Sequence, residues 1–388
     1  MTTNVYLPVA PSILGAMVDY QGFSIPVAGR LVSFIFWGTT AGTVLAILIL
    51  HRPGWNLQLT ILVCMLLVII SSGANVWLVD SVNALAVVCF ATGLGAGLGF
   101  TVCAVALIGT PHAERSYAIH YGSAFVISGV GLAFLPYVYQ AVGIEGAFYA
   151  FGAINILALG LLPFFPKTVT GPDQSNEARE SSGDRQVMLL ASILLAALFL
   201  HFVCNSGIWA YFERIGVAYG MSSETAGAIL GPSMSTAAIG MIGATILGDR
   251  WGYLRPLYIG TFIITLSTLL LFFSSSPVLF GIGTGVFNAA ITFVSPYFIA
   301  LLALLIPAGF GVSAGNIAIQ AGFSTGPLVL SFLIVGEDFR LSILLTAAGF
   351  LVVIVMVYLF SRVLQQGAEY QERVKQLCDF PRGQPRTG

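Results

Sequence analysis

The sequence predicts an all-α polytopic membrane protein with about twelve transmembrane helices, and its composition and pattern support this fold class. Of its 388 residues, 57% are hydrophobic and only 8% are charged. A soluble domain carries about 25% charged residues, so this chain cannot cover its whole surface with charge. Apolar runs of about 20 residues recur along it. Helices are expected because a backbone in lipid must satisfy its own hydrogen bonds.

Twelve candidate spans follow one another along the chain. They lie near residues 1–17, 30–50, 57–76, 83–109, 117–140, 144–165, 187–211, 223–247, 256–274, 278–306, 313–335 and 340–361. The first of them is shorter than the roughly 20 residues that a span needs. We therefore expect that the first helix is truncated and that residue 1 is not the true start.

The longest polar stretch, residues 167–186, divides the chain into two halves. It reads KTVTGPDQSNEARESSGDRQ, and its content of Gly, Ser and charge is typical of a linker. We expect a six-helix bundle over 1–166 and a second over 187–362. Residues 363–388 carry mixed charge and are predicted to form a cytoplasmic tail.

Basic residues are distributed unequally between the two sides of the predicted membrane. If the amino terminus is cytoplasmic, twelve of the 15 Lys and Arg residues fall on that side, and only Arg30, Arg214 and Arg340 fall on the other. This bias follows the positive-inside rule and predicts that both termini are cytoplasmic. We expect the protein to lie in a bacterial inner membrane.

The two halves also repeat each other. Glycines and loop residues of the second span recur in the eighth, 198 positions later. The matched positions are Ala28, Gly29, Gly42 and Arg52 with Ala226, Gly227, Gly240 and Arg250. An even number of spans per half makes the repeats parallel, about an axis along the membrane normal, which is a known architecture of secondary transporters.

The loop at residues 248–256, GDRWGYLRP, carries the most specific motif. It resembles the signature loop D-R-x-G-x-x-R of the major facilitator superfamily, and the resemblance covers nearly the whole chain. The resemblance implies two six-helix bundles around a central solute path. It also implies a cytoplasmic latch, in which Asp249 accepts hydrogen bonds from the N-terminal amides of a neighbouring helix. The alternative is a solvated turn with positive-inside charge. The expected latch residues are Asp249, Arg250, Gly252, Arg255 and Arg52.

Three positions depart from the pattern of this family. His51 stands where the first-half loop should carry an acid, and Cys89 stands where many members have an Arg tied to proton coupling. The Gly322 to Pro327 segment resembles a Gly-Pro motif that antiporters carry in their fifth helix, but here it lies in the eleventh span. Proton-coupled symport and drug or metabolite efflux therefore both stay open.

Polar and aromatic side chains within the spans are the candidate solute contacts, because polar groups in membrane helices usually face the bundle interior or a wet cavity. The expected substrate-binding residues are His201, Asn205, Trp209, Asn288, Thr292, Tyr297, Gln320 and Trp37. Three of them, His201, Asn205 and Trp209, lie four residues apart on one helical face. Alternative roles are hydrogen bonding between helices for Asn and Gln, backbone bonding for Thr, and packing for Trp.

Two further features bear on coupling. His201 is an ionisable side chain deep within a span, so it is the candidate for carrying a proton. Glu213-Arg214 lies near the outer interface, where a structural ion pair or a gate is expected rather than a binding site.

The function predicted from the sequence is secondary active or facilitated transport of a small neutral or amphipathic solute by alternating access. No G-x-x-x-x-G-K-[ST] loop is present, and no His/Asp/Glu cluster within the spans suggests an enzyme. We expect no cofactor, no metal and no nucleic-acid partner. The expected partners are a small-molecule solute and the lipid bilayer, with protons as an open alternative. The chain is expected to be a monomer. A non-transporting sensor or scaffold of the same fold is the rival prediction.

Overall fold

The computed structural model describes residues 6–50, 54–108, 113–168, 185–305 and 308–366. Within these ranges the regular elements are helices, and the β-type pairing is one isolated bridge between Val335 and Asp338. The prediction of an all-α fold is confirmed. Arg52, the linker from 169 to 184 and the tail from 367 onwards lie outside the described residues.

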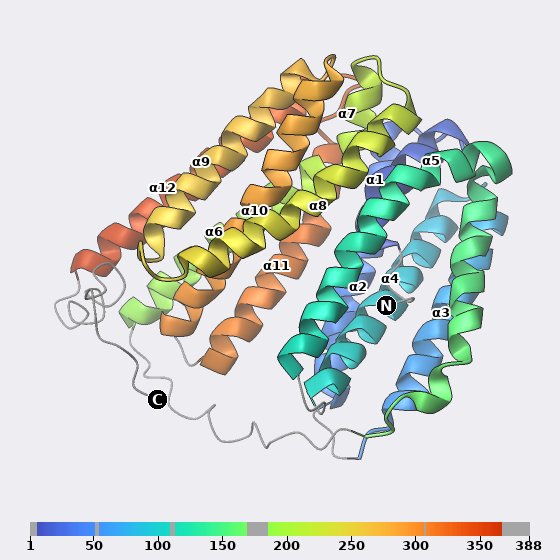
Figure 1. Cartoon of the computed structure of the whole chain (residues 1–388), viewed down its shortest axis with the longest axis horizontal. Helices are drawn as coiled ribbons and strands as arrows, with labels where there is room; N and C mark the ends of the chain where they lie inside the picture. Colours follow the sequence, from blue (N-terminus) through green and yellow to red (C-terminus); the bar gives the residue numbers. More distant parts are fainter. Residues whose placement is uncertain (1–5, 51–53, 109–112, 169–184, 306–307, 367–388) are drawn as a thin grey trace.

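The helices form two groups, which lie side by side in Figure 1. The N-terminal bundle consists of α1 to α5, and the C-terminal bundle of α6 to α12. The first group contains the short η2 (Leu7–Val9), then α1 (Ala10–Asp19), α2 (Ile25–Leu50), α3 (Leu57–Trp77), α4 (Val82–Ile108) and α5 (Ala113–Leu159). The second contains α6 (Arg185–Ala210), α7 (Phe212–Ala218), α8 (Ser223–Leu247), α9 (Leu254–Leu270), α10 (Pro277–Leu305), α11 (Ala308–Ser331) and α12 (Arg340–Gln366).

Nine helices of the described residues are long and apolar enough to cross a membrane. One of them, α5, contains the fifth predicted span and most of the sixth, as far as Leu159. A straight helix of its 47 residues would be about 70 Å long, more than twice the thickness of a hydrocarbon core. The chain instead reverses at Gly143, whose φ of 70° is readily adopted only by glycine. The predicted boundary between 140 and 144 therefore coincides with this break.

Close helix packing reproduces the internal repeat. In α2, a Cβ on Gly42 would overlap the carbonyl oxygen of Leu94 in α4. In α8, 198 residues later, a Cβ on Gly240 would overlap the carbonyl oxygen of Ala289 in α10. Both glycines let two backbones approach more closely than any side chain would permit. Gly42 and Gly240, matched positions of the sequence repeat, thus make the same kind of close helix contact in the two bundles.

The two bundles meet along α1 with α7, α2 with α11, and α5 with α8. We name the two ends of the molecule by what lies there: the α7 end, where α1 ends and α2 begins, and the Asp249 end, where α8 ends. The Oγ of Ser33 donates to the carbonyl of Ser324 at 2.5 Å, and Gly129 lies against the backbone of Gly231. These residues lie in the parts of their helices nearer the α7 end. From there α5 and α8 diverge toward the other end (Figure 1).

Candidate solute path and the ion cluster between the bundles

Trp209 of α6 lies where the two bundles meet. Its ring stacks on Phe36 of α2, with ring centroids 6.4 Å apart and an interplanar angle of 26°. It also packs at 5.8 Å against Phe323 of α11, and Phe323 in turn contacts Phe36 at 5.1 Å. Asn205 lies one helical turn before Trp209 and is buried. Trp209, the last residue of the predicted stripe on α6, therefore faces the other bundle.

His201, the third residue of that stripe, lies elsewhere. Its ring is fully buried and packs against Phe202, against Phe298 of α10 and against Phe350 of α12, with centroids about 5.5 Å apart. Neither ring nitrogen has a hydrogen-bond partner among the described residues. A charged imidazolium in such an apolar site would be costly, so the surroundings suit a neutral ring. Its roles in solute contact and proton carriage stay predictions.

The three candidates on α10 are bonded to α8, within the C-terminal bundle. The Asn288 amide donates to the carbonyl and the hydroxyl of Ser233 at 3.4 Å. Thr292 donates to the carbonyl of Ala237 at 2.7 Å, and the Tyr297 hydroxyl contacts the carbonyl of Ala244 at 3.4 Å. These bonds connect two helices of one bundle. Solute contact by these residues remains a prediction.

The last two candidates lie on the helices that join the bundles. The backbone carbonyl of Gln320, in α11, accepts a hydrogen bond from Thr40 of α2 at 3.2 Å. The Thr40 hydroxyl also bonds the hydroxyl of Ser324 at 2.7 Å. Trp37 is 38% exposed on α2. The neutral polar contacts between α2 and α11 thus adjoin the aromatic group formed by Phe36, Trp209 and Phe323.

The predicted latch lies at the Asp249 end, in the turn between α8 and α9. Gly252 has a φ of 69°, and its N–H closes the turn by donating to the carbonyl of Asp249 at 2.9 Å. Asp249 is half-buried, while Arg250 and Arg255 are exposed. Among the described residues the Asp249 carboxylate makes no hydrogen bond or ion pair. The latch role stays a prediction.

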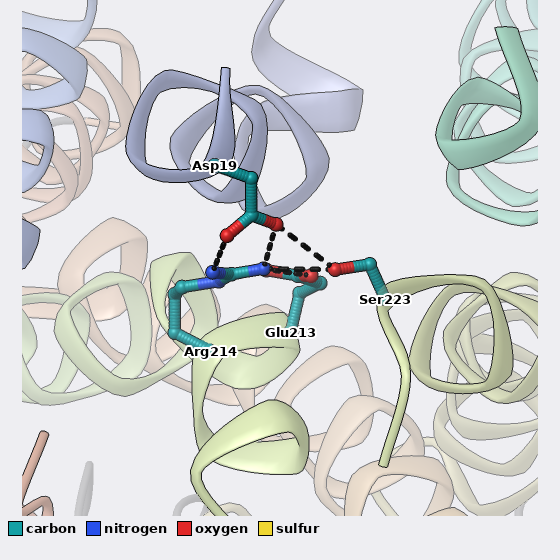
Figure 2. Close-up of polar contacts among 4 residues, drawn as sticks. All are labelled: Asp19, Glu213, Arg214 and Ser223. Atoms are coloured by element: carbon teal, nitrogen blue, oxygen red, sulfur yellow. Dashed lines mark hydrogen bonds and ion pairs between the residues drawn. The ribbon is translucent and has the colours of Figure 1, made fainter. Parts of the chain in front are cut away.

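An ion pair joins the two bundles at the α7 end, and Figure 2 shows it. Arg214 of α7 directs one edge of its guanidinium to Asp19 of α1, with Nη1 and Nη2 each 2.7 Å from a carboxylate oxygen. Its other edge faces Glu213, with Nε at 2.5 Å and Nη2 at 2.6 Å. Ser223 of α8 accepts from Nη2 at 2.9 Å and donates to Asp19 at 3.2 Å. We call these four residues the ion cluster.

The ion cluster is buried from one side and open to solvent on the other. The side chains of Arg214 and Glu213 are 4% and 3% exposed, whereas Asp19 is 40% exposed. Burial raises the pKa of the Glu213 carboxyl, while the hydrogen bonds and positive charge of Arg214 act in the opposite direction. With both acids ionised, two carboxylates share one guanidinium, and the cluster carries a net charge of −1.

Sequence reasoning placed Glu213 and Arg214 at a gate or a structural ion pair but missed their partner. Asp19 is the first acidic residue of the chain, directly after an apolar run. A second signal is Gly15, one turn earlier on α1, where a Cβ would overlap the Glu213 carboxylate. An acid at the end of an apolar helix, preceded by a glycine on the same face, could have indicated a buried basic partner.

The family model of the major facilitator superfamily matches residues 1–315. The chain belongs to the major facilitator superfamily. It is therefore an integral membrane transporter rather than an enzyme, as the sequence predicted. No curated protein matches the sequence.

Solved structures of several transporters of known solute share this fold. The nucleoside transporter NupG superposes over 94% of this chain and 97% of its own, with a TM-score of 0.71 and 12% identity. The partially occluded inward-open structure of the xylose transporter XylE from E. coli covers 92% of this chain and 95% of its own, with a TM-score of 0.71 and 12% identity. A peptide transporter POT variant reaches a TM-score of 0.73 at 11% identity, over 98% and 93% of the two chains. At these identities the likeness shows the fold.

Proposed function

We propose that this transporter moves a small neutral or amphipathic solute by alternating access, with the halves 1–166 and 187–362 rocking about a site between them. The observation that carries the proposal is the pair of hydrogen bonds from Arg214 to Asp19, because it joins the two bundles at one end of the molecule. In a rocking mechanism such contacts form when one end closes and break when it opens.

The structure supports a state closed at the α7 end. Besides the ion cluster, Gln140 of α5 donates a hydrogen bond to Glu224 of α8, and Ser33 of α2 bonds α11. Gly129 and Gly231 bring the backbones of α5 and α8 into contact, deeper between the bundles than the ion cluster. Opening this end would require all of these contacts between the bundles to separate together.

The charge pattern suggests which side the α7 end faces. Arg30, Arg214 and Arg340 lie toward this end, whereas the other twelve Lys and Arg residues of the sequence lie in the remaining loops, in the helix ends beside them and in the tail. By the positive-inside rule the α7 end is then external, and the Asp249 end with both termini is cytoplasmic. We accordingly assign the described state as closed to the outside.

The side chains where α2 meets α6 and α11 indicate the class of solute. Phe36, Trp209 and Phe323 offer aromatic faces, and Thr40 and Asn205 offer neutral polar groups. None of these five side chains is charged, so they fit a neutral solute with an apolar or ring face and a few polar groups. Nucleosides, xylose and peptides, named for the structural neighbours, are small polar organic solutes of comparable size and support this class.

Trp209→Ala is expected to lower solute flux about fivefold at an unchanged membrane level. The indole contributes a large flat surface between the bundles, and aromatic contacts of this kind contribute about 0.5–1.5 kcal/mol beyond the area they bury. The measurement is untargeted metabolite profiling of cells and medium, comparing strains that produce the parent chain or the variant. One compound class should shift between cell and medium with the parent and much less with Trp209→Ala.

Trp77→Ala is the matched control, because Trp77 is 78% exposed at the end of α3. It should transport like the parent. If no compound moves with the parent chain although it reaches the membrane, the non-transporting sensor becomes the better proposal. Equal flux in the parent and Trp209→Ala would instead refute a solute site at Trp209.

A further inference from the structure

We propose that Glu213 is a proton-binding site and that closure of the α7 end takes up one proton on its carboxylate. The proposal deepens the proposed function and rests on it, since it supposes that the α7 end opens and closes. It differs from the sequence-based expectation, which placed the proton on His201.

The position of Glu213 between the bundles is the first support. The Glu213 carboxylate packs against Gly15 of α1, so closely that a Cβ on this glycine would overlap it. The Glu213 side chain is buried. Glu213 and Arg214 are neighbours on one short helix, so they stay paired when the bundles separate. Asp19 belongs to the other bundle, so it moves away from Arg214 when the bundles separate. Opening therefore changes which groups share the guanidinium, without breaking the pair within α7.

The charge balance is the second support. In the open state Arg214 and Glu213 form a neutral pair. Closure adds the carboxylate of Asp19 to the same guanidinium, so the buried cluster would become negative. One proton from water at the α7 end, bound to a Glu213 oxygen, makes it neutral again: Asp19 keeps its two hydrogen bonds to Arg214, and Glu213 is a neutral acid. The proton returns to water at that end when it reopens.

A pocket beside the cluster offers the proton a partner. It has a volume of about 220 Å³ and is lined by residues of α1, α5, α7 and α8, among them Ser12, Tyr139 and Glu213. The hydroxyls of Ser12 and Tyr139 are buried close to each other, and among the described residues neither has any other hydrogen-bond partner. A hydroxyl has two lone pairs, so either can accept the new O–H of a protonated Glu213.

The other titratable groups around Glu213 are less suited to hold the proton. At the end of α1, Asp19 is partly solvated and accepts two hydrogen bonds from Arg214, and Tyr20, the next residue, is exposed. On α5, Tyr139 is a phenol and stays protonated. On α8, Glu224 accepts from Gln140 at the rim of the pocket. Glu213 is thus the fully buried acid in this group, and burial disfavours its charged form.

The sign of the pH effect follows from the two states. In the open state Glu213 meets water and ionises as an ordinary carboxyl. In the closed state burial raises its pKa. Protons therefore bind the closed state more tightly, and falling pH must shift the population toward closure of the α7 end.

The test measures this population directly, without solute. Spin labels are placed at Asp80→Cys and Val335→Cys, exposed positions beyond α3 and α11 at the α7 end of the two bundles, after the native cysteines are replaced. Label distances are recorded in lipid nanodiscs between about pH 5 and pH 8. The short-distance, closed population should increase as pH falls. Glu213→Gln should lose this response and hold the short distance at every pH, whereas Glu213→Asp should keep a response with a shifted midpoint.

Glu337→Gln is the matched control, because Glu337 is an exposed acid at the same end of the same bundle. It should respond like the parent. A pH response that persists in Glu213→Gln, or its absence from the parent, would overturn the proposal. If the labels respond as expected but no solute moves in the profiling experiment, the proton site stands and transport fails. If solute moves and the labels ignore pH, transport stands and the proton site fails.

Discussion

Replacing Arg214 with glutamine is expected to destabilise the protein strongly and to abolish transport. Above the pH at which Glu213 takes up its proton, the variant leaves a buried carboxylate without its cationic partner, and at any pH it removes the bonds to Asp19. Removing one partner of a buried ion pair typically costs about 3–5 kcal/mol. The defect should shrink as pH falls, because a Glu213 without Arg214 can take up a proton and become neutral. Thermal denaturation of the purified protein in detergent at several pH values measures both effects.

Two further variants show whether the cause is the ion cluster. Glu213→Gln combined with Arg214→Gln should recover much of the lost melting temperature, since the unpaired charge is then gone. Arg214→Lys should have a melting temperature below that of the parent, because an ammonium group cannot bind two carboxylates edge-on as a guanidinium does. A melting temperature of Arg214→Gln equal to that of the parent would contradict the pairing.

Asp19→Asn is expected to shift the conformational equilibrium toward a state open at the α7 end. Hydrogen bonds to charged groups contribute about 1.5–3 kcal/mol, and each 1.4 kcal/mol corresponds to about a tenfold change in an equilibrium. The open population should therefore increase about tenfold or more. A membrane-impermeant thiol reagent reads this at Ser33→Cys, because Ser33 is buried between α2 and α11 and becomes accessible only when they separate.

The control for this experiment is Asp80→Asn. Asp80 is an exposed acid at the same end of the same bundle, and it makes no ion pair in the described part of the chain. Its replacement should leave the labelling rate of Ser33→Cys unchanged. Equal rates for Asp19→Asn and the parent would show that the ion pair does not hold this end closed.

The fold could be predicted from the sequence because each of its signals is local. A span needs only its own apolar residues, and Gly143 marks the reversal between the fifth and sixth spans within a few positions. The repeat was also visible, since Gly42 and Gly240 each need a small side chain for the same kind of helix contact.

The site was harder to predict because it depends on contacts between distant segments. Asp19 and Arg214 are 195 residues apart, and no local pattern connects them. Helical spacing groups His201 with Asn205 and Trp209 on one predicted face. Spacing cannot say, however, that α10 and α12 cover the part of that face at His201, whereas α2 and α11 cover the part at Trp209.

Locking the α7 end shut is the most direct test of alternating access in this chain. Gln140 of α5 and Glu224 of α8 are hydrogen-bonded across the bundles, so cysteines at both positions can be joined by a short, reducible crosslinker in proteoliposomes. With the solute found by profiling, we expect crosslinking to stop flux and a reductant to restore it, while either single cysteine is unaffected. Undiminished flux through the crosslinked protein would contradict a mechanism in which this end must open.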